Sequence, residues 1–140
     1  MSRLGRRLAF DYGDVRIGVA VCDPDGILAT PLDFLSTKDP ALKSSILALC
    51  SEYEPAKIYV GLPLNLSGEE SEATKKAIAF SDLLTQLVSC PVKLVDERLT
   101  TSSASASLSQ AGINAKDQRK KIDSQSAVII LESGLAQDRE

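Results

Sequence analysis

The stretch LAFDYGDVRIGVAV, residues Leu8 to Val21, decides the fold. Apolar, β-branched and aromatic residues dominate 7–12 and 16–22, and the Gly13-Asp14 pair between these runs is a turn signal. This pattern predicts an antiparallel β-hairpin. One carboxylate, Asp11, lies inside the first apolar run, and a buried charge is costly unless it is paired or binds a metal ion. Asp11 is therefore the first candidate for a functional residue.

The rest of the chain predicts a third strand followed by alternating helices and strands. After a turn at 23–26 an extended run covers 27–35, and Asp39 is a good N-cap, with Pro40 at the first helical position, for a helix that Pro55 ends. The later elements are a strand at 57–62, a helix from Ser67 to Val88 that opens with a Ser67–Glu70 capping box, a strand at 92–95, a helix that starts at Thr100 or Thr101 and ends at Gly112, and a last helix that begins at Ile122 and frays over 137–140.

The resulting order, βββαβαβαα, predicts one α/β domain over residues 1–140. Its sheet is mixed and five-stranded, with a three-strand antiparallel meander, two parallel strands beside the first strand, and helices on both faces. The carboxyl ends of the first, fourth and fifth strands would then lie side by side, where open α/β sheets bind ligands.

The composition excludes several kinds of chemistry. The chain has 140 residues, 44% hydrophobic and 25% charged, which is typical of a soluble globular protein. It contains no histidine, which excludes Ser-His-Asp and Cys-His catalysis. Acid–base or metal chemistry must therefore rest on carboxylates. The net charge of -3 excludes a globally basic protein but permits a local basic patch.

The cysteines and the N-terminus predict a cytoplasmic protein. Cys22, Cys50 and Cys90 lack CxxC or CxH spacing, so neither a disulfide framework nor a zinc site is indicated, and we expect three reduced thiols. The apolar run near the N-terminus is too short for a signal peptide, and no run approaches membrane-spanning length.

Four carboxylates lie where the predicted sheet would bring them to one edge. Asp11 ends the first strand, Asp96 and Glu97 end the fifth, and Asp123 begins the last helix. Three converging carboxylates repel one another unless a divalent cation lies among them, so this arrangement predicts a Mg²⁺ site. Carboxylate-bound Mg²⁺ supports in-line attack of water on a phosphodiester without any histidine.

Nearby residues fit the same chemistry. Gly13 and Gly18 would let the backbone pass close to a phosphate, and Arg16 would supply a cation near that group. The basic segment Arg119 to Lys121 would close on a phosphate backbone, through contacts that weaken steeply as salt rises.

Each of these features also has a simpler structural explanation. Arg98, which follows Glu97, could bind substrate, but it could also pair with a nearby carboxylate and only support the site. Asp11 could be an ordinary turn residue, and one of Asp96 and Glu97 could be a surface charge. Asp123 could simply complement the dipole of the last helix, and 119–121 could be a solvated loop.

The motifs together resemble one known family. They are FDYGDVRIGVAV from Phe10, VGLPLNLSG from Val60, VDERLTT from Val95 and KKIDSQSAVIIL from Lys120. In this order and at this spacing they resemble the YqgF family, also called RuvX, of Holliday-junction-resolvase-like proteins. The likeness covers nearly the whole chain. It implies an RNase H-like fold, nuclease activity, and a role in maturing the small-subunit ribosomal RNA precursor.

The resemblance also implies roles for particular residues. Asp11, Glu97 and Asp123 look like the metal-binding and catalytic acidic triad, with Asp96 as the alternate for the middle position. Arg16, Arg98 and Thr100 look like substrate-binding or site-supporting residues, and Gly61 and Asn65 look like part of the loop flanking the cleft. This loop departs from the family pattern, which usually has an acidic residue where this chain has Ser67. From chemistry and resemblance together, the expected substrate-binding residues are Gly13, Arg16, Gly18, Asn65, Arg98, Thr100, Arg119, Lys120 and Lys121.

The expected function is phosphodiester hydrolysis in structured nucleic acid by a Mg²⁺- or Mn²⁺-dependent nuclease, with water as the nucleophile. The expected partner is structured RNA, above all the pre-16S ribosomal RNA and its precursor particles. A Holliday junction resolvase acting on branched DNA and a noncatalytic RNA-binding assembly factor are the alternatives, and both a monomer and a homodimer stay open. Actin-like and sugar-kinase ATPases also begin with Asp-x-Gly in a hairpin, but they need two such domains and this chain has room for one.

Overall fold

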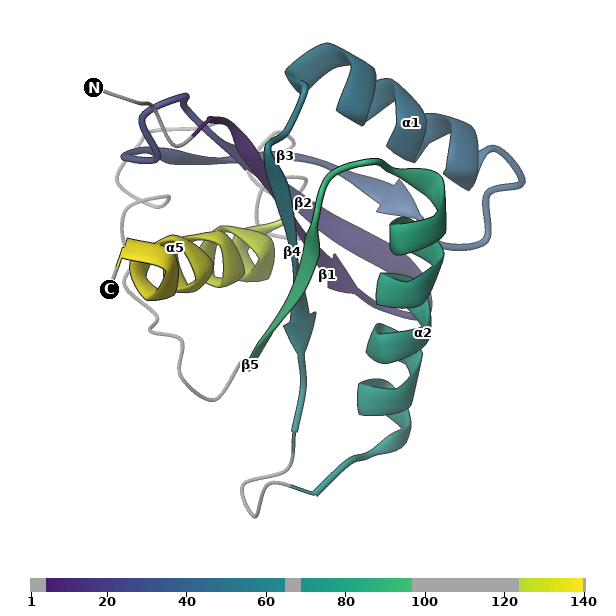
Figure 1. The fold of residues 1–140 in the computed structure, drawn as a ribbon. Coiled ribbons are helices and arrows are strands. Elements are labelled where there is room, and N and C mark those ends of the chain that lie inside the picture. Colours follow the sequence, from purple (N-terminus) through teal and green to yellow (C-terminus); the bar gives the residue numbers. More distant parts are fainter. Residues whose placement is uncertain (1–4, 65–68, 97–123, 140) are drawn as a thin grey trace, which may run out of the picture.

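The computed structural model describes residues 5–64, 69–96 and 124–139 (Figure 1). The elements are β1 (Arg7–Tyr12), β2 (Arg16–Cys22), β3 (Ala29–Ser36), α1 (Leu42–Tyr53), β4 (Lys57–Leu62), α2 (Glu72–Leu87), β5 (Val92–Asp96) and α5 (Gln125–Arg139). No helix in this described part of the chain is long and apolar enough to cross a membrane. The helix expected between Thr100 and Gly112 lies outside the described residues.

The five strands form one mixed sheet in the order β3-β2-β1-β4-β5. β1, β2 and β3 pair antiparallel, and β4 and β5 are added to the other side of β1 as parallel strands. The predicted meander and the position of the parallel strands beside the first strand are confirmed. The carboxyl ends of β1, β4 and β5 therefore lie at one edge of the sheet.

Helices cover both faces of the sheet (Figure 1). On one face Ala9, Tyr59 and Val95 pack in a core with apolar residues of α5. On the other face Phe10 and Val60 belong to the core under α1 and α2. Because successive strand residues point to opposite faces, odd-numbered residues of β1, β4 and β5 face α5 and even-numbered residues face α1 and α2.

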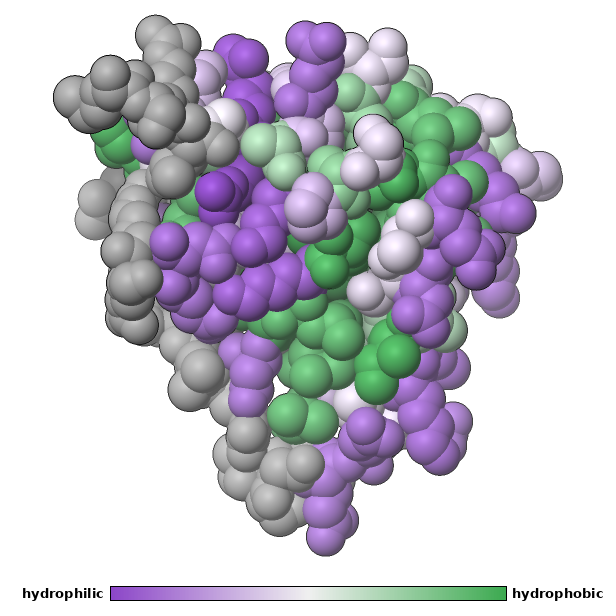
Figure 2. All heavy atoms as spheres, in the orientation of Figure 1, coloured by the Kyte–Doolittle hydropathy of each residue, from purple (hydrophilic) through white to green (hydrophobic). Residues whose placement is uncertain are grey.

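The edge strand β5 is only partly covered. Val92 and Leu94 are half-buried against the core on the α2 side, and Figure 2 shows hydrophobic residues at the surface between β5 and α2. Lys93 lies between them in sequence and points to the opposite face. A short edge strand that carries a lysine is a poor template for pairing with another chain.

Helix α1 starts two residues later than the sequence predicts. Asp39 does not cap the helix directly, because its Oδ1 accepts the backbone N–H of Ala41 at 2.9 Å, in a turn that precedes Leu42. The expected strand at 27–35 is likewise shifted, since Asp23 Oδ1 holds the N–H groups of Ile27 and Leu28 in the preceding turn.

Helix α2 is capped by Ser71, and the expected Ser67–Glu70 capping box is wrong. Ser71 Oγ accepts the N–H of Thr74 at 3.3 Å, and Thr74 Oγ1 accepts the N–H of Ser71 at 3.0 Å. Thr74 Oγ1 also donates to the carbonyl of Pro63, at the end of β4. Glu70 instead forms an isolated antiparallel bridge with Leu64. This contact to the β4 end favours the later serine, and it is invisible in a local sequence pattern.

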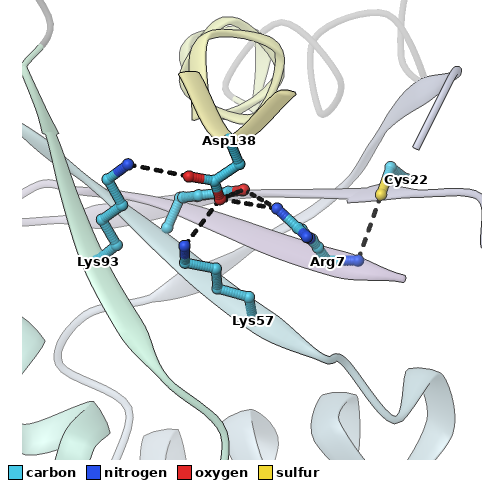
Figure 3. Close-up of polar contacts among 6 residues, drawn as sticks. Arg7, Cys22, Lys57, Lys93 and Asp138 are labelled. Carbon is cyan, nitrogen blue, oxygen red and sulfur yellow. Dashed lines mark hydrogen bonds and ion pairs between the residues drawn. The ribbon is translucent and has the colours of Figure 1, made fainter. Parts of the chain in front are cut away.

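Helix α5 does not fray at its end as predicted but extends to Arg139. Four side chains bind Asp138 there, and Figure 3 shows Arg7, Lys57 and Lys93 around its carboxylate. Asp138 Oδ2 accepts from Arg7 Nη1 at 2.8 Å, Lys57 Nζ at 2.7 Å and Tyr59 Oη at 2.5 Å. Its Oδ1 accepts from Lys93 Nζ at 3.0 Å, and Arg7 also donates to Tyr59 Oη. We call these five residues the Asp138 cluster. Its partners come from β1, β4 and β5, so it fixes the last turn of α5 against three parallel strands.

Candidate active site

Asp11 lies at the carboxyl end of β1, on the face of the sheet that α5 covers. It pairs with Gly18 of the antiparallel strand β2. Paired residues of neighbouring strands project to the same face, so Gly18, which has no side chain, lies beside Asp11 on the β2 side. The sheet therefore presents one carboxylate at the strand ends, next to a residue without a side chain.

Asp96 ends β5, and one strand separates it from Asp11. β4 lies between the two strands, and Asp96 pairs with Leu62 of β4. Val95 faces α5, so the alternation along the strand points Asp96 to the α2 face, away from the Asp11 carboxylate. The ends of β1, β4 and β5 lie side by side as predicted, with β4 between the other two, and the alternation directs Asp11 and Asp96 to opposite faces of the sheet.

The start of α5 is anchored beside this place by Ser124. The pairing of β2 with β3 shifts register between Ile17 and Val19. Ser124 is fully buried, accepts the N–H of Val19 at 3.1 Å, and donates to the carbonyl of Leu32 at 2.5 Å. Its hydroxyl thus bridges β2 and β3 at the irregular point of the ladder. Gly18, which pairs with Asp11, lies at this same point. Ser124, the residue that precedes α5, therefore lies close to the end of the sheet where Asp11 is.

The hairpin tip between β1 and β2 is held rigidly. Thr37 Oγ1 donates to the carbonyl of Gly13 at 2.7 Å, and the Thr37 N–H donates to the carbonyl of Val15 at 3.0 Å. A Cβ on Gly13 would lie 2.6 Å from the carbonyl oxygen of Arg16, so the tight turn itself requires glycine. The tight turn therefore explains why glycine occupies position 13 without any contact to a phosphate.

Two cations flank the tip. Arg16 is exposed, with its guanidinium carbon 5.2 Å from the centre of the Phe34 ring. Lys76 of α2 pairs with Asp14 at 2.9 Å, and this hydrogen bond raises the pKa of the Lys76 ammonium above its usual value. Arg16 and Lys76 therefore place two cationic side chains at this edge of a protein whose overall charge is -3.

Most of the expected site residues lie outside the described residues. They are Asn65, Glu97, Arg98, Thr100, Arg119, Lys120, Lys121 and Asp123. Within residues 5–64, 69–96 and 124–139 no three carboxylates or thiols gather as a metal site. The structure thus places Asp11, Gly13, Arg16, Gly18 and Gly61 at the strand-end edge.

Sequence reasoning missed Ser124, Thr37 and Lys76. Ser124 lies in the segment KKIDSQSAVIIL. Its partners, the Val19 N–H and the Leu32 carbonyl, lie at a register shift that no local sequence pattern reveals. Thr37 and Lys76 contact the tip across 24 and 62 residues of chain.

The arrangement of strands and helices defines a class of fold, the RNase H-like fold. The structure matches Thermus thermophilus RuvC in complex with a Holliday junction substrate with a TM-score of 0.58 at 15% identity, covering 96% of each chain. A second T. thermophilus RuvC structure matches with a TM-score of 0.51 at 14% identity. At such identities these matches establish the fold alone.

The sequence comparisons then identify the family. A family model described as RuvX, Holliday junction resolvase, matches residues 5–137. A Streptomyces avermitilis protein named "Putative pre-16S rRNA nuclease" is 48% identical over 139 residues, which cover 98% of this chain and 89% of that protein. A Mycobacterium ulcerans protein of the same name is 47% identical over 137 residues, covering 96% of this chain and 81% of that protein. The chain belongs to the RuvX family of nucleases, and the resemblance noted in the sequence is confirmed.

Proposed function

We propose that this protein is a divalent-metal-dependent nuclease that processes the precursor of 16S ribosomal RNA. The observation that carries the proposal is the Asp11 carboxylate at the end of β1, paired with Gly18 close to the anchored start of α5. The names of its relatives support an RNA substrate.

The metal would be held by Asp11, Glu97 and Asp123. Carboxylate oxygens are the ligands that Mg²⁺ and Mn²⁺ prefer, so the donor set fits either ion. When bound, such an ion stabilises charge on the attacking and leaving oxygens of a phosphodiester. Asp123 directly precedes Ser124 in the sequence. The anchored Ser124 therefore supports a place for Asp123 near the start of α5.

Glu97 is the better middle member of the triad than Asp96. Asp96 points to the α2 face of the sheet, whereas Asp11 points to the α5 face. A carboxylate that shares a metal ion with Asp11 has to reach the α5 face. The alternation along β5 therefore favours Glu97 over Asp96 for this role.

The chain's own residues would hold the substrate beside the metal. Arg16 extends from β2 at the strand-end edge and is exposed to a phosphate. Arg98, Thr100 and the basic segment Arg119 to Lys121 would add contacts, with Asn65 in the flanking loop and Lys120 at the centre of the segment. Because such contacts release counterions, binding would weaken steeply as salt rises.

The test is cleavage of two labelled substrates, an RNA with the unprocessed 16S end and a four-way DNA junction, with Mg²⁺, with Mn²⁺ and with EDTA. We expect metal-dependent cutting of the RNA that falls at least about 100-fold in Asp11→Asn, Glu97→Gln and Asp123→Asn, since each removes a metal ligand. Asp96→Asn is the matched control and should keep most of the activity. Calorimetric titration with Mn²⁺ gives a readout independent of activity and should show weakened binding only in the three triad variants.

The second candidate function is resolution of Holliday junctions, which the description of the family model favours. Symmetric cutting of the junction by a dimer, with the RNA left intact, would select it. RNA binding without metal-dependent cutting, unchanged by Asp11→Asn, would overturn both nuclease assignments and leave a noncatalytic assembly factor.

We also place the protein in the cytoplasm. Cys22, Cys50 and Cys90 are all free thiols, which a reducing compartment preserves. Fractionation of cells that express a tagged chain tests this, and a periplasmic or membrane-bound protein would contradict it.

A further inference from the structure

A hollow lies at the same sheet edge as Asp11, on the opposite face. It has a volume of about 250 Å³ and lies between the end of β1, the start of α1 and the middle of α2. Tyr12, Ala79 and Leu83 contribute to its walls, and Lys76 and Thr37 contribute the polar groups. Sites for drug-sized ligands measure about 300–1,000 Å³, so this hollow suits one small ring system.

The Tyr12 ring is fixed as a flat wall of the hollow. It packs against Phe80 with ring centres 5.0 Å apart and a tilt of 37°. Phe80 is almost fully buried and is itself held edge-on by Phe10, with ring centres 5.8 Å apart. A ring that the core holds in one orientation loses little entropy when a ligand stacks on it.

The polar groups at the hollow suit a phosphate next to that ring. Lys76 bears an ammonium that pairs with Asp14, and both side chains are about half exposed or more. Exposed ion pairs contribute little net free energy and are screened by salt, so a phosphate can replace Asp14 at small cost. The Thr37 hydroxyl already donates its hydrogen bond to the Gly13 carbonyl, so Thr37 forms a rigid part of the wall.

Position links the hollow to the candidate active site. Tyr12 follows Asp11 directly and is the last residue of β1. The two side chains point to opposite faces of the sheet at its edge. A nucleic-acid strand that passes over this edge can present a phosphate to the Asp11 face and a neighbouring base to the Tyr12 face.

We propose that this hollow binds one unstacked nucleobase of the substrate strand, one or two nucleotides from the bond that is cut. The base stacks on Tyr12 between apolar side chains of α2, and its phosphate contacts Lys76. Single-stranded nucleic acids are commonly held by such a pairing of aromatic rings with cations. The proposal deepens the proposed function and rests on it.

The test uses a six-nucleotide RNA that carries one 2-aminopurine, mixed with the whole protein in EDTA so that no cutting occurs. Stacking on Tyr12 should quench the fluorescence of the probe. Tyr12→Leu should abolish the quenching, and Ala79→Phe, which fills the hollow, should weaken binding roughly tenfold, because one stacked base is at stake. Ala48→Phe places the same new ring at an exposed position of α1, outside the hollow, and is the matched control.

The outcomes separate this proposal from the function it rests on. Quenching that Tyr12→Leu and Ala79→Phe remove and Ala48→Phe leaves intact supports the base site. Tight binding without quenching, equal in Ala79→Phe and wild type, overturns the base site while nucleic-acid binding stands. Absence of binding to this probe and to longer structured RNA overturns both.

Discussion

Replacing Asp138 with asparagine should destabilise the protein strongly, although the residue lies at the opposite end of the strands from Asp11. The substitution keeps the shape of the side chain but removes the only negative charge of the Asp138 cluster. Arg7, whose side chain is 11% exposed, then keeps a buried positive charge, while Lys57 and Lys93 are 24% and 36% exposed and recover part of their hydration. Breaking a buried ion pair from one side costs about 3–5 kcal/mol. The partial exposure of the lysines places the expected loss at the lower end, about 3 kcal/mol.

Urea unfolding at pH 7 measures this loss. With a slope of about 2 kcal/mol per molar urea, a 3 kcal/mol loss lowers the midpoint by about 1.5 M. Asp82→Asn removes an exposed carboxylate from α2 and should leave the midpoint nearly unchanged. A midpoint for Asp138→Asn as close to wild type as that of the control would refute the view that the cluster stabilises the fold.

The pH dependence follows from the same carboxyl group. Burial alone would raise the pKa of Asp138, but hydrogen bonds from Lys57, Tyr59 and Lys93 outweigh burial and hold the pKa well below its usual range. A group whose pKa is lower in the folded state contributes stability above its unfolded pKa of about 3.9, and loses it as the pH falls below that value. The gap in stability between wild type and Asp138→Asn should therefore be constant near neutrality and shrink as the pH falls below about 4. A gap that stays constant down to pH 2 would contradict this assignment.

Three further substitutions test the anchoring of α5. Ser124→Ala leaves the Val19 N–H without its buried partner, which costs about 1–3 kcal/mol. Thermal unfolding should show this loss in Ser124→Ala and no loss in the control Ser126→Ala, which changes an exposed serine. Gly134→Ala puts a Cβ 2.7 Å from the Tyr59 ring and should lower the melting temperature in spite of the better helix propensity of alanine, whereas an unchanged or raised value would show that the ring moves freely. Tyr59→Phe removes the hydroxyl that binds Asp138 and should cost about 1–2 kcal/mol by urea unfolding, less than Asp138→Asn, because the charges remain paired.

Much of the fold could be predicted because it is encoded locally. The two apolar runs around Gly13 define the β1–β2 hairpin, and the alternation of helical and extended patterns after Asp39 fixes the parallel strands. The position of Asp11 at a strand end followed from the hairpin alone. Its relation to Asp96 did not, because the face of a strand residue depends on register, and a shift of one residue reverses it.

The parts that could not be predicted depend on long-range contacts. The Asp138 cluster joins residues 45 to 131 positions apart, and each of its cations reads in sequence as an ordinary surface charge. Ser71 and Ser67 are equally plausible caps by composition, and only the contact of Thr74 with Pro63 favours Ser71. For Glu97 and Asp123 the family motifs still provide the main argument.

The Asp138 cluster also has a consequence for the order in which the molecule is made. During synthesis Arg7, Lys57 and Lys93 leave the ribosome before Asp138, which follows Arg7 by 131 residues. Until then the starts of β1, β4 and β5 carry like charges, with no carboxylate from α5 between them. Docking of α5 is therefore a late event of folding, and a chain released before residue 138 would keep three mutually repelling cations at the edge of an unfinished sheet.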